Sequence, residues 1–420
     1  MKDIDSIDSI DASCIDPIDF YSKYIKNRIP CKFINHINDT TWKGYQWTNS
    51  YLKDKVNDDV SVRIEKRETS NDRYGKGNER IMKFSEFLHQ LNNEDDTLYL
   101  TTQDLEYDDE GRPSLYSNPV KQLIGDFPLR PKLMGNLIPQ NYNIWMGYSK
   151  VPSSSGLHHD FHDNLYILLR GEKHISLFPP TTATDMYTVG EIVKIYENGR
   201  INYAGQLTNE DGSDPNVEKA LKASLALEKA GDDDDSEEME RALEDALDAE
   251  IEGDDDDFDD ENEDDDNEDD EADYIDPSIL PEYLKAESSI TGKRKQQESA
   301  DPLQKKSKSN GASKEPCNFS KVDTSLPDKE LKKHFPNYIN ALKTKIEVTV
   351  SAGEMLYIPA GWFHEVKSMS SENPSKDLPG HMAFNYWFHP PSVQSQNKEE
   401  TISFDKPYRS DFWSNDYFSQ

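Results

Sequence analysis

The sequence is poor in cysteine, in long apolar runs and in positive charge. Its 420 residues include three cysteines, too few and too scattered for a disulfide framework or a zinc site, which favours a reducing compartment. No apolar run reaches the ~18 residues of a membrane span. The acidic first 20 residues also lack the basic and apolar regions of a secretory signal. We therefore expect a protein of the cytoplasm, the nucleus or both, and not a secreted one.

The shortage of positive charge comes from one segment. Of the net charge of −35, −30 lies between Thr208 and Asp276, where 34 acidic residues stand against four basic ones. The remainder is mildly acidic and long enough for one sizeable core. An acidic tract of this kind cannot bury enough apolar surface to offset the entropy lost on ordering. We predict a large acidic disordered insert over residues 205–320.

Two functions are open for this insert. It can attract basic proteins while repelling nucleic acid, or it can be a solvated linker that only aids solubility. Basic clusters at 293–295 and 305–308 are typical of a two-part nuclear import signal. Deletion of residues 210–315 is the test: any activity of the folded part should survive it, whereas localisation or partner binding would change if the insert binds partners.

The rest of the chain is dense in short strands. An Ile-Asp repeat over 1–19 predicts a poorly ordered start. We predict helices over 17–28 and 84–91, and strands over 31–34, 60–64, 97–100, 164–169, 173–178, 346–350, 355–358 and 382–388. Many short strands with Gly and Pro turns favour a mainly β sandwich or barrel with N-terminal α/β elements. We divide the chain into an N-terminal extension (1–28), a discontinuous β domain (29–204 and 321–392), the insert (205–320) and a tail (393–420) that packs on the barrel or forms a dimer contact.

Two histidines and one carboxylate suggest a metal site. Residues two apart on a strand point to the same side, so His158 and Asp160 share a face with the apolar positions of 164–168 if the strand continues without a bulge. His364 follows a second strand and a Pro-Ala-Gly turn. Buried His and Asp side chains are costly unless something pairs them. Two imidazoles and one carboxylate leave half of an octahedron open, which suits Fe(II) or Mn(II) better than zinc.

Lys173 strengthens this prediction. It opens a strand whose alternate residues are Ile175 and Leu177, so its side chain points inward and needs an anion. The alternative is a lysine at a turn that extends outward to solvent. If it points inward, Lys173 pairs with a dicarboxylate co-substrate, and Ser155 and Tyr99 add hydroxyl donors. We expect the other histidines singled out to be ordinary, hydrogen-bonded residues: His159, His162, His174, His334, His381 and His389.

At these residues the chain resembles the JmjC oxygenases of the cupin superfamily, in particular their small hydroxylase-type members. The segments that carry the resemblance are SGLHHDFHDNLY (155–166), RGEKH (170–174), FPP (178–180), AGEMLYIPAGWFH (352–364) and AFNYW (383–387). Weaker similarity extends back to residues 29–31. The resemblance covers about two thirds of the chain and excludes the insert.

The resemblance implies a double-stranded β-helix, the cupin or jelly-roll fold, that uses Fe(II), 2-oxoglutarate and O2. His158, Asp160 and His364 match the iron ligands. The residues that match co-substrate-binding positions are Lys173, Ser155, Tyr99, Asn164 and Asn385. No catalytic residue beyond the metal site is expected, because the metal centre carries the chemistry. Gly361 stands where relatives have a larger residue, which predicts a wider mouth.

The implied activity is hydroxylation of a side chain, with lysine as one case, on a protein substrate. N-methyl-lysine demethylation is an alternative that uses the same centre. A catalytically weak cupin that binds basic proteins through its acidic insert is an alternative of another class. A nucleic-acid substrate is disfavoured, since the folded part shows no strong basic stripe. The sequence makes no prediction of an oligomeric state.

Overall fold

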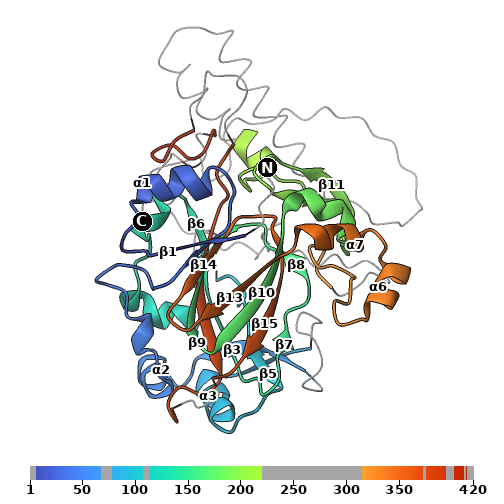
Figure 1. Cartoon of the computed structure of the whole chain (residues 1–420). Helices are drawn as coiled ribbons and strands as arrows, with labels where there is room; N and C mark the ends of the chain where they lie inside the picture. The colour runs from blue at the N-terminus through green and yellow to red at the C-terminus, as the bar shows by residue number, and fades with distance from the viewer. Residues whose placement is uncertain are drawn as a thin grey trace, which may run out of the picture. The chain divides into compact units, whose positions relative to one another are not determined.

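The structure is a computed structural model that describes residues 6–67, 78–106, 114–219, 315–371, 375–393, 402–410 and 413. The chain divides into two compact units, one of residues 1–212 and 306–420 and one of residues 213–305. The first unit carries all of the elements below (Figure 1). Residues 220–314, which include most of the acidic residues of the insert and both basic clusters, lie outside the described residues.

The first unit is built mainly of strands. These are β1 (Asp8–Ile10), β2 (Cys31–Phe33), β3 (Ser61–Lys66), β4 (Glu79–Lys83), β5 (Leu98–Leu100), β6 (Pro139–Gly147), β7 (Ser153–Ser154), β8 (His158–His159), β9 (Asp163–Arg170), β10 (Glu172–Phe178), β11 (Ile192–Ile195), β12 (Ile201–Tyr203), β13 (Ile346–Ser351), β14 (Met355–Ile358), β15 (Phe363–Met369) and β16 (His381–Phe388). The α-helices are α1 (Pro17–Phe20), α2 (Asn49–Lys55), α3 (Phe84–Asn92), α6 (Asp328–His334) and α7 (Tyr338–Ala341). No helix of the described residues has the length and apolar character to cross a bilayer.

Two sheets form the barrel. The larger has the order β1-β2-β14-β9-β16-β6-β5-β3-β4, and the smaller has β13-β10-β15-β7 with β8 paired to β15. Strands β8, β9, β10 and, later, β14, β15, β16 alternate between the two sheets, as a double-stranded β-helix requires. Figure 1 shows β13, β10 and β15 side by side. The predicted mainly β, cupin-like fold is confirmed.

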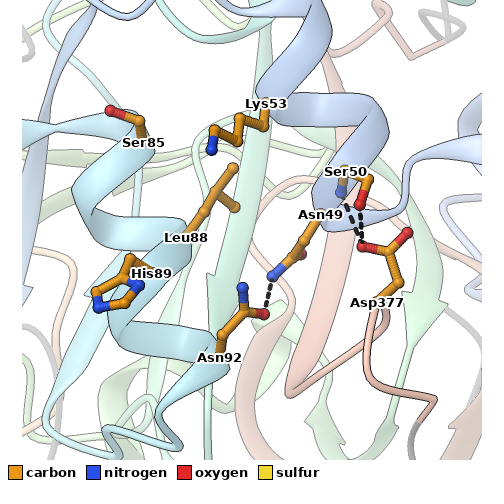
Figure 2. Close-up of a pocket in the computed structure, with 8 residues that line it drawn as sticks. All are labelled: Asn49, Ser50, Lys53, Ser85, Leu88, His89, Asn92 and Asp377. Atoms are coloured by element: carbon orange, nitrogen blue, oxygen red, sulfur yellow. Dashed lines mark hydrogen bonds between the residues drawn. The ribbon is translucent and has the colours of Figure 1, made fainter.

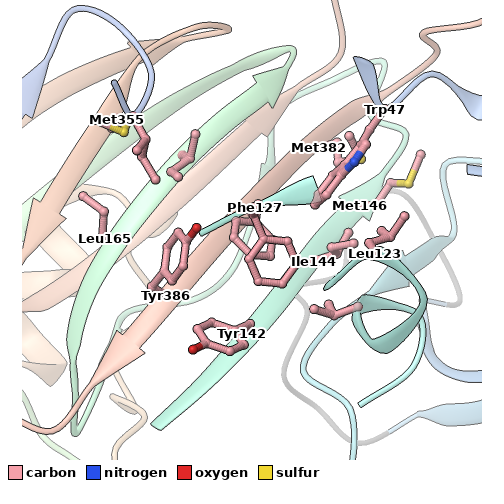
Figure 3. Close-up of a cluster of buried hydrophobic side chains, with 14 of the residues drawn as sticks. Trp47, Leu123, Phe127, Tyr142, Ile144, Met146, Leu165, Met355, Met382 and Tyr386 are labelled. Carbon is pink, nitrogen blue, oxygen red and sulfur yellow. The ribbon is translucent and has the colours of Figure 1, made fainter. Parts of the chain in front are cut away.

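Both faces of β9, in the middle of the larger sheet, are buried, because alternate side chains meet two different cores. On β9, Leu165 and Ile167 join a cluster that also contains Trp47, Phe127 and Tyr386 (Figure 3). Tyr166 and Leu168 point the other way, into the barrel, and pack with residues of the smaller sheet. The metal-ligand candidates lie on this inner side, so their surroundings are the interior of the barrel.

Two sequence expectations were wrong in detail. The chain start is not poorly ordered throughout, because residues 8–10 form β1, parallel to β2, and Tyr24 donates a hydrogen bond to the Asp8 carboxylate at 2.8 Å. The strand of His158 does not continue into β9. The carbonyls of Asp160 and Phe161 accept hydrogen bonds from loop donors instead of a strand neighbour, and this interrupts the ladder at 160–162.

Candidate metal centre

The structure brings His158, Asp160 and His364 together. One ligand atom from each residue lies within 4.8 Å of the other two. His158 and His364 are register partners on β8 and β15, and their ring centroids are 4.4 Å apart. Asp160 reaches the pair from the bend that follows β8, so its position depends on the interruption of the strand and not on the strand alternation that predicted it.

Each imidazole presents one nitrogen to the site. Nδ1 of His158 lies 2.9 Å from the carbonyl oxygen of Gly156, and Nδ1 of His364 lies 3.0 Å from that of Trp362. A carbonyl only accepts, so both Nδ1 atoms carry hydrogen and both Nε2 lone pairs remain available. Fixing the tautomer through the second nitrogen is the usual arrangement for a histidine that binds metal.

Asp160 is held by neutral donors. Its Oδ2 accepts hydrogen bonds from Asn164 Nδ2 at 3.1 Å and from Trp387 Nε1 at 3.3 Å, and it lies 3.8 Å from Nε2 of His364. Asn385 extends the network, because it donates to Asn164 at 3.0 Å and accepts from the indole of Trp145 at 2.8 Å. Asn164 thus holds the carboxylate directly and Asn385 acts through Asn164, while the co-substrate binding predicted for both stays a prediction.

The surroundings keep His158 neutral. Burial and the neighbouring His364 lower its pKa to about 4, against the opposing effect of Asp160. The ring of Phe319 stacks on it with centroids 4.8 Å apart and planes at 12°. Phe319 also forms a β-bridge with His158. Residues 205–219 and 315–320, assigned to the insert from sequence, are described, and the latter stretch forms one wall of this site.

Lys173 is fully buried and points inward, so the predicted orientation is confirmed. Its Nζ donates to Ser368 Oγ at 2.6 Å and lies 3.2 Å from Nδ1 of His381. No acidic side chain of the described residues forms an ion pair with it. Burial lowers its pKa to about 7. A buried cation between neutral partners is costly, and an anionic ligand would stabilise it.

The contacts of Ser155 and Tyr99, the remaining candidates for co-substrate binding, do not test that role. The hydroxyl of Ser155 donates to the carbonyl of Gly156 at 2.9 Å and accepts from the backbone of Val366 at 3.0 Å. The ring of Tyr99 lies 5.9 Å from that of His381, near Lys173. Their roles in co-substrate binding stay predictions.

Gly361 does not widen the site. Its φ is +76°, and an added Cβ would lie 1.7 Å from the backbone oxygen of Gly199. The space that a larger residue would take is therefore filled by another segment of the chain. Gly361 also donates its backbone N–H to the carbonyl of Asp160 at 2.9 Å, so this close contact supports the bend that carries the carboxylate.

The other histidines differ among themselves. His159 is buried and bonds to the hydroxyl of Tyr203 at 2.7 Å, as expected of an ordinary residue. His162 has no hydrogen bond within the described part of the chain and packs between Trp387 and His389. His381 is the case that sequence reasoning missed, because nothing in its spacing shows that it contacts Lys173.

A cavity of about 230 Å³ lies elsewhere. Residues of α2, α3 and the loop before β16 line it: Asn49, Ser50, Lys53, Ser85, Leu88, His89, Asn92 and Asp377 (Figure 2). Asn49 accepts a hydrogen bond from Arg170 at the end of β9. Asn164 stands six residues earlier on that strand, or about 20 Å away. This cavity is therefore separate from the metal-ligand candidates.

Comparison with known proteins agrees with this geometry. Residues 17–394 match the family model of a cupin-like domain. JmjC domain-containing protein 4 of Schizosaccharomyces pombe is 33% identical, over 93% of this chain and 85% of its own length. JmjC domain-containing protein E of Dictyostelium discoideum is 25% identical over 206 residues, which cover 44% of this chain and 55% of that protein.

Proposed function

Because the chain belongs to the cupin-like JmjC family, a family of iron- and 2-oxoglutarate-dependent oxygenases and demethylases, we propose that the protein is an Fe(II)- and 2-oxoglutarate-dependent dioxygenase. Its reaction would be the hydroxylation of a side chain, with lysine as one case, on a protein substrate. The observation that carries the proposal is the convergence of His158, Asp160 and His364 within 4.8 Å inside the barrel.

The donor set fits ferrous iron. Two neutral imidazole nitrogens and one carboxylate form a face that leaves other positions open for a co-substrate and dioxygen. Iron bound there would supply the oxidation of a C–H bond at the expense of 2-oxoglutarate. The chain's own part is to hold the ligands: Gly156 and Trp362 orient the two rings, and Asn164 and Trp387 orient Asp160.

The position of Lys173 fits the binding of 2-oxoglutarate. It lies opposite Ser368 on β15, and the ligand candidate His364 stands four residues earlier on that strand. Four strand residues span about 13 Å. A lysine side chain together with a five-carbon dicarboxylate fills such a span, with one carboxylate at the ammonium and the other end at the metal. Anchoring one end in this way fixes the orientation before reaction.

The proposal is tested by mass spectrometry. Candidate proteins are incubated with the full-length chain, Fe(II) and 2-oxoglutarate, and succinate release is followed in parallel. Gain of one oxygen on a substrate side chain is the expected result. Loss of a methyl group would instead identify a demethylase. If the wild type consumes no more 2-oxoglutarate than the His364→Ala variant, the protein acts as a binding module and the enzymatic assignment is wrong.

We also propose that the acidic insert binds basic proteins and that the protein resides in the cytoplasm, the nucleus or both. The acidic charge of the insert supports the binding of basic proteins. Its basic clusters at 293–295 and 305–308 support entry into the nucleus. Fluorescent fusions with and without these clusters test the location. Affinity capture with and without residues 220–314 tests the partners.

A further inference from the structure

Lys173 is one end of a buried chain of hydrogen bonds that runs away from the metal-ligand residues. Its Nζ lies 3.2 Å from Nδ1 of His381. Nε2 of His381 lies 3.0 Å from Ser149 Oγ, which lies 2.7 Å from Ser153 Oγ. All four side chains are buried, the lysine and the histidine completely. No sequence motif links these residues, and the donor set of the metal does not include them.

The direction of each hydrogen bond follows from the chemistry. An ammonium group only donates, so Nδ1 of His381 accepts and its Nε2 carries the hydrogen that is donated to Ser149. Burial, with Lys173 and Arg67 nearby, lowers the pKa of His381 well below its ordinary value. The imidazole is therefore neutral, in one tautomer, and fixed at both nitrogens.

This arrangement fixes the direction in which the Lys173 ammonium group can donate its remaining hydrogen bond. An ammonium has three N–H groups. One donates to Ser368 and one to His381, and the described residues provide no acceptor for the third. Two neutral acceptors on β15 and β16 thus set the rotation of the ammonium without neutralising it. One N–H and the whole positive charge remain for a carboxylate.

The neighbouring strand leaves room for the histidine. Gly147 on β6 is the register partner of both Tyr99 on β5 and His381 on β16. A Cβ on Gly147 would lie 2.9 Å from the ring of Tyr99 and 3.3 Å from that of His381. Any larger residue at this position would push both rings away from the place where they now lie.

We propose that His381 is a positioning residue that orients Lys173 toward the distal carboxylate of 2-oxoglutarate, and that Gly147 provides the space for it. This inference rests on the proposed function. It assigns a role to a histidine that neither touches the metal nor belongs to the ligand set.

Two substitutions separate the hydrogen bond to the lysine from simple packing. In His381→Asn the side-chain oxygen can occupy the place of Nδ1 and still accept from Lys173. In His381→Gln the amide reaches the place of Nε2 and serves Ser149, but Lys173 loses its acceptor. 2-Oxoglutarate binding is measured by calorimetry with Fe(II) under anaerobic conditions, and KM and kcat are measured in turnover.

The expected pattern is asymmetric. His381→Gln should weaken 2-oxoglutarate binding and raise its KM about tenfold, the effect of losing one hydrogen bond to a charged group, while His381→Asn should stay within about threefold. Because the lysine lies far from the metal-ligand atoms, kcat should change by less than about threefold in both variants, as for loss of uniform binding. Gly147→Ala should resemble His381→Gln.

Equal losses in both His381 variants, accompanied by a lower melting temperature or weaker Fe(II) binding, would mean that the residue only maintains the fold, and would overturn the proposal. Unchanged 2-oxoglutarate binding in His381→Gln would overturn it as well. A wild-type protein that binds Fe(II) but no 2-oxoglutarate would refute the proposed function itself, and the role of His381 would fall with it.

Discussion

Replacing Lys173 by methionine should stabilise the protein in the absence of iron and 2-oxoglutarate, although it removes two hydrogen bonds. Burial lowers the pKa of Lys173 from 10.5 to about 7. At 1.36 kcal/mol per unit, keeping this lysine charged in the folded state costs about 5 kcal/mol. The hydrogen bonds to Ser368 and His381 offset about 1 kcal/mol each. The variant should therefore gain about 3 kcal/mol at pH 6.5.

The difference in unfolding free energy between the two proteins should also depend on pH. Because the pKa is lower in the folded state, the unfolded chain binds more protons between pH 7 and 10.5. Wild-type stability therefore rises with pH in this window relative to the variant. The advantage of Lys173→Met should shrink by about 3 kcal/mol between pH 7 and 9.5. Other titrating groups affect both proteins equally and cancel in the difference.

Urea unfolding followed by tryptophan fluorescence measures both proteins at several pH values, with a chelator present. A difference in unfolding free energy that stays constant from pH 6.5 to 9.5 would refute the reasoning, since it would mean that Lys173 is not desolvated. As a second readout, adding 2-oxoglutarate to the Fe(II)-loaded protein should raise the melting temperature of the wild type further but not that of the variant, because a ligand stabilises only the state that binds it.

Three further predictions concern the frame around the site. Gly361→Ala should lower the free energy of unfolding by about 3 kcal/mol or more and weaken Fe(II) binding. Its control is Gly205→Ala, where the glycine has the same φ of +76° and no neighbour within 4 Å, and where the loss should be only about 1 kcal/mol. Thermal unfolding and metal titration compare the two variants. Arg28→Met should cost about 3–5 kcal/mol in urea unfolding because it leaves the buried Asp163 carboxylate without its cation, and adding Asp163→Asn should recover part of this. Deletion of residues 220–314 should leave Fe(II) affinity and turnover of a short peptide within about twofold, and a larger loss would give this segment a role at the site.

The strand pattern and the inward orientation of Lys173 could be predicted because they depend on local order. Short apolar runs placed β9, β14 and β16 to within about one residue, as expected where both faces of a strand are buried, and the alternation of apolar residues placed β10 equally well. The same alternation predicted that Lys173 points inward, since its neighbours Ile175 and Leu177 are apolar. Such predictions need only the period of a strand and a preference for burial.

Features that depend on contacts between distant segments were not predictable. The interruption after β8 arises because Arg200 and Gly361 donate to the carbonyls of Phe161 and Asp160, and nothing near residue 160 signals them. The contact of His381 with Lys173 crosses 208 residues of sequence. The glycine at 361 was misread for the same reason, because its requirement comes from the approach of Gly199.

The insert separates the candidate metal ligands by a long stretch of sequence, and yet these ligands converge. Its flanks meet: Cys317 Sγ donates to the side-chain oxygen of Gln206 at 3.0 Å, and Gly190 donates to the carbonyl of Cys317 at 2.9 Å. The two flanks are therefore held together by contacts within the first unit. The returning strand, however, brings Phe319 onto His158, so it is part of the site. Residues 315–320, assigned to the insert from the sequence, are thus part of the folded unit around the site. On the other side of the insert, Asp211 accepts hydrogen bonds from His389 and Trp413. A deletion of 210–315, drawn from composition alone, would remove Asp211 and cut to the edge of the returning strand, which is why the structure moves the cut to 220–314.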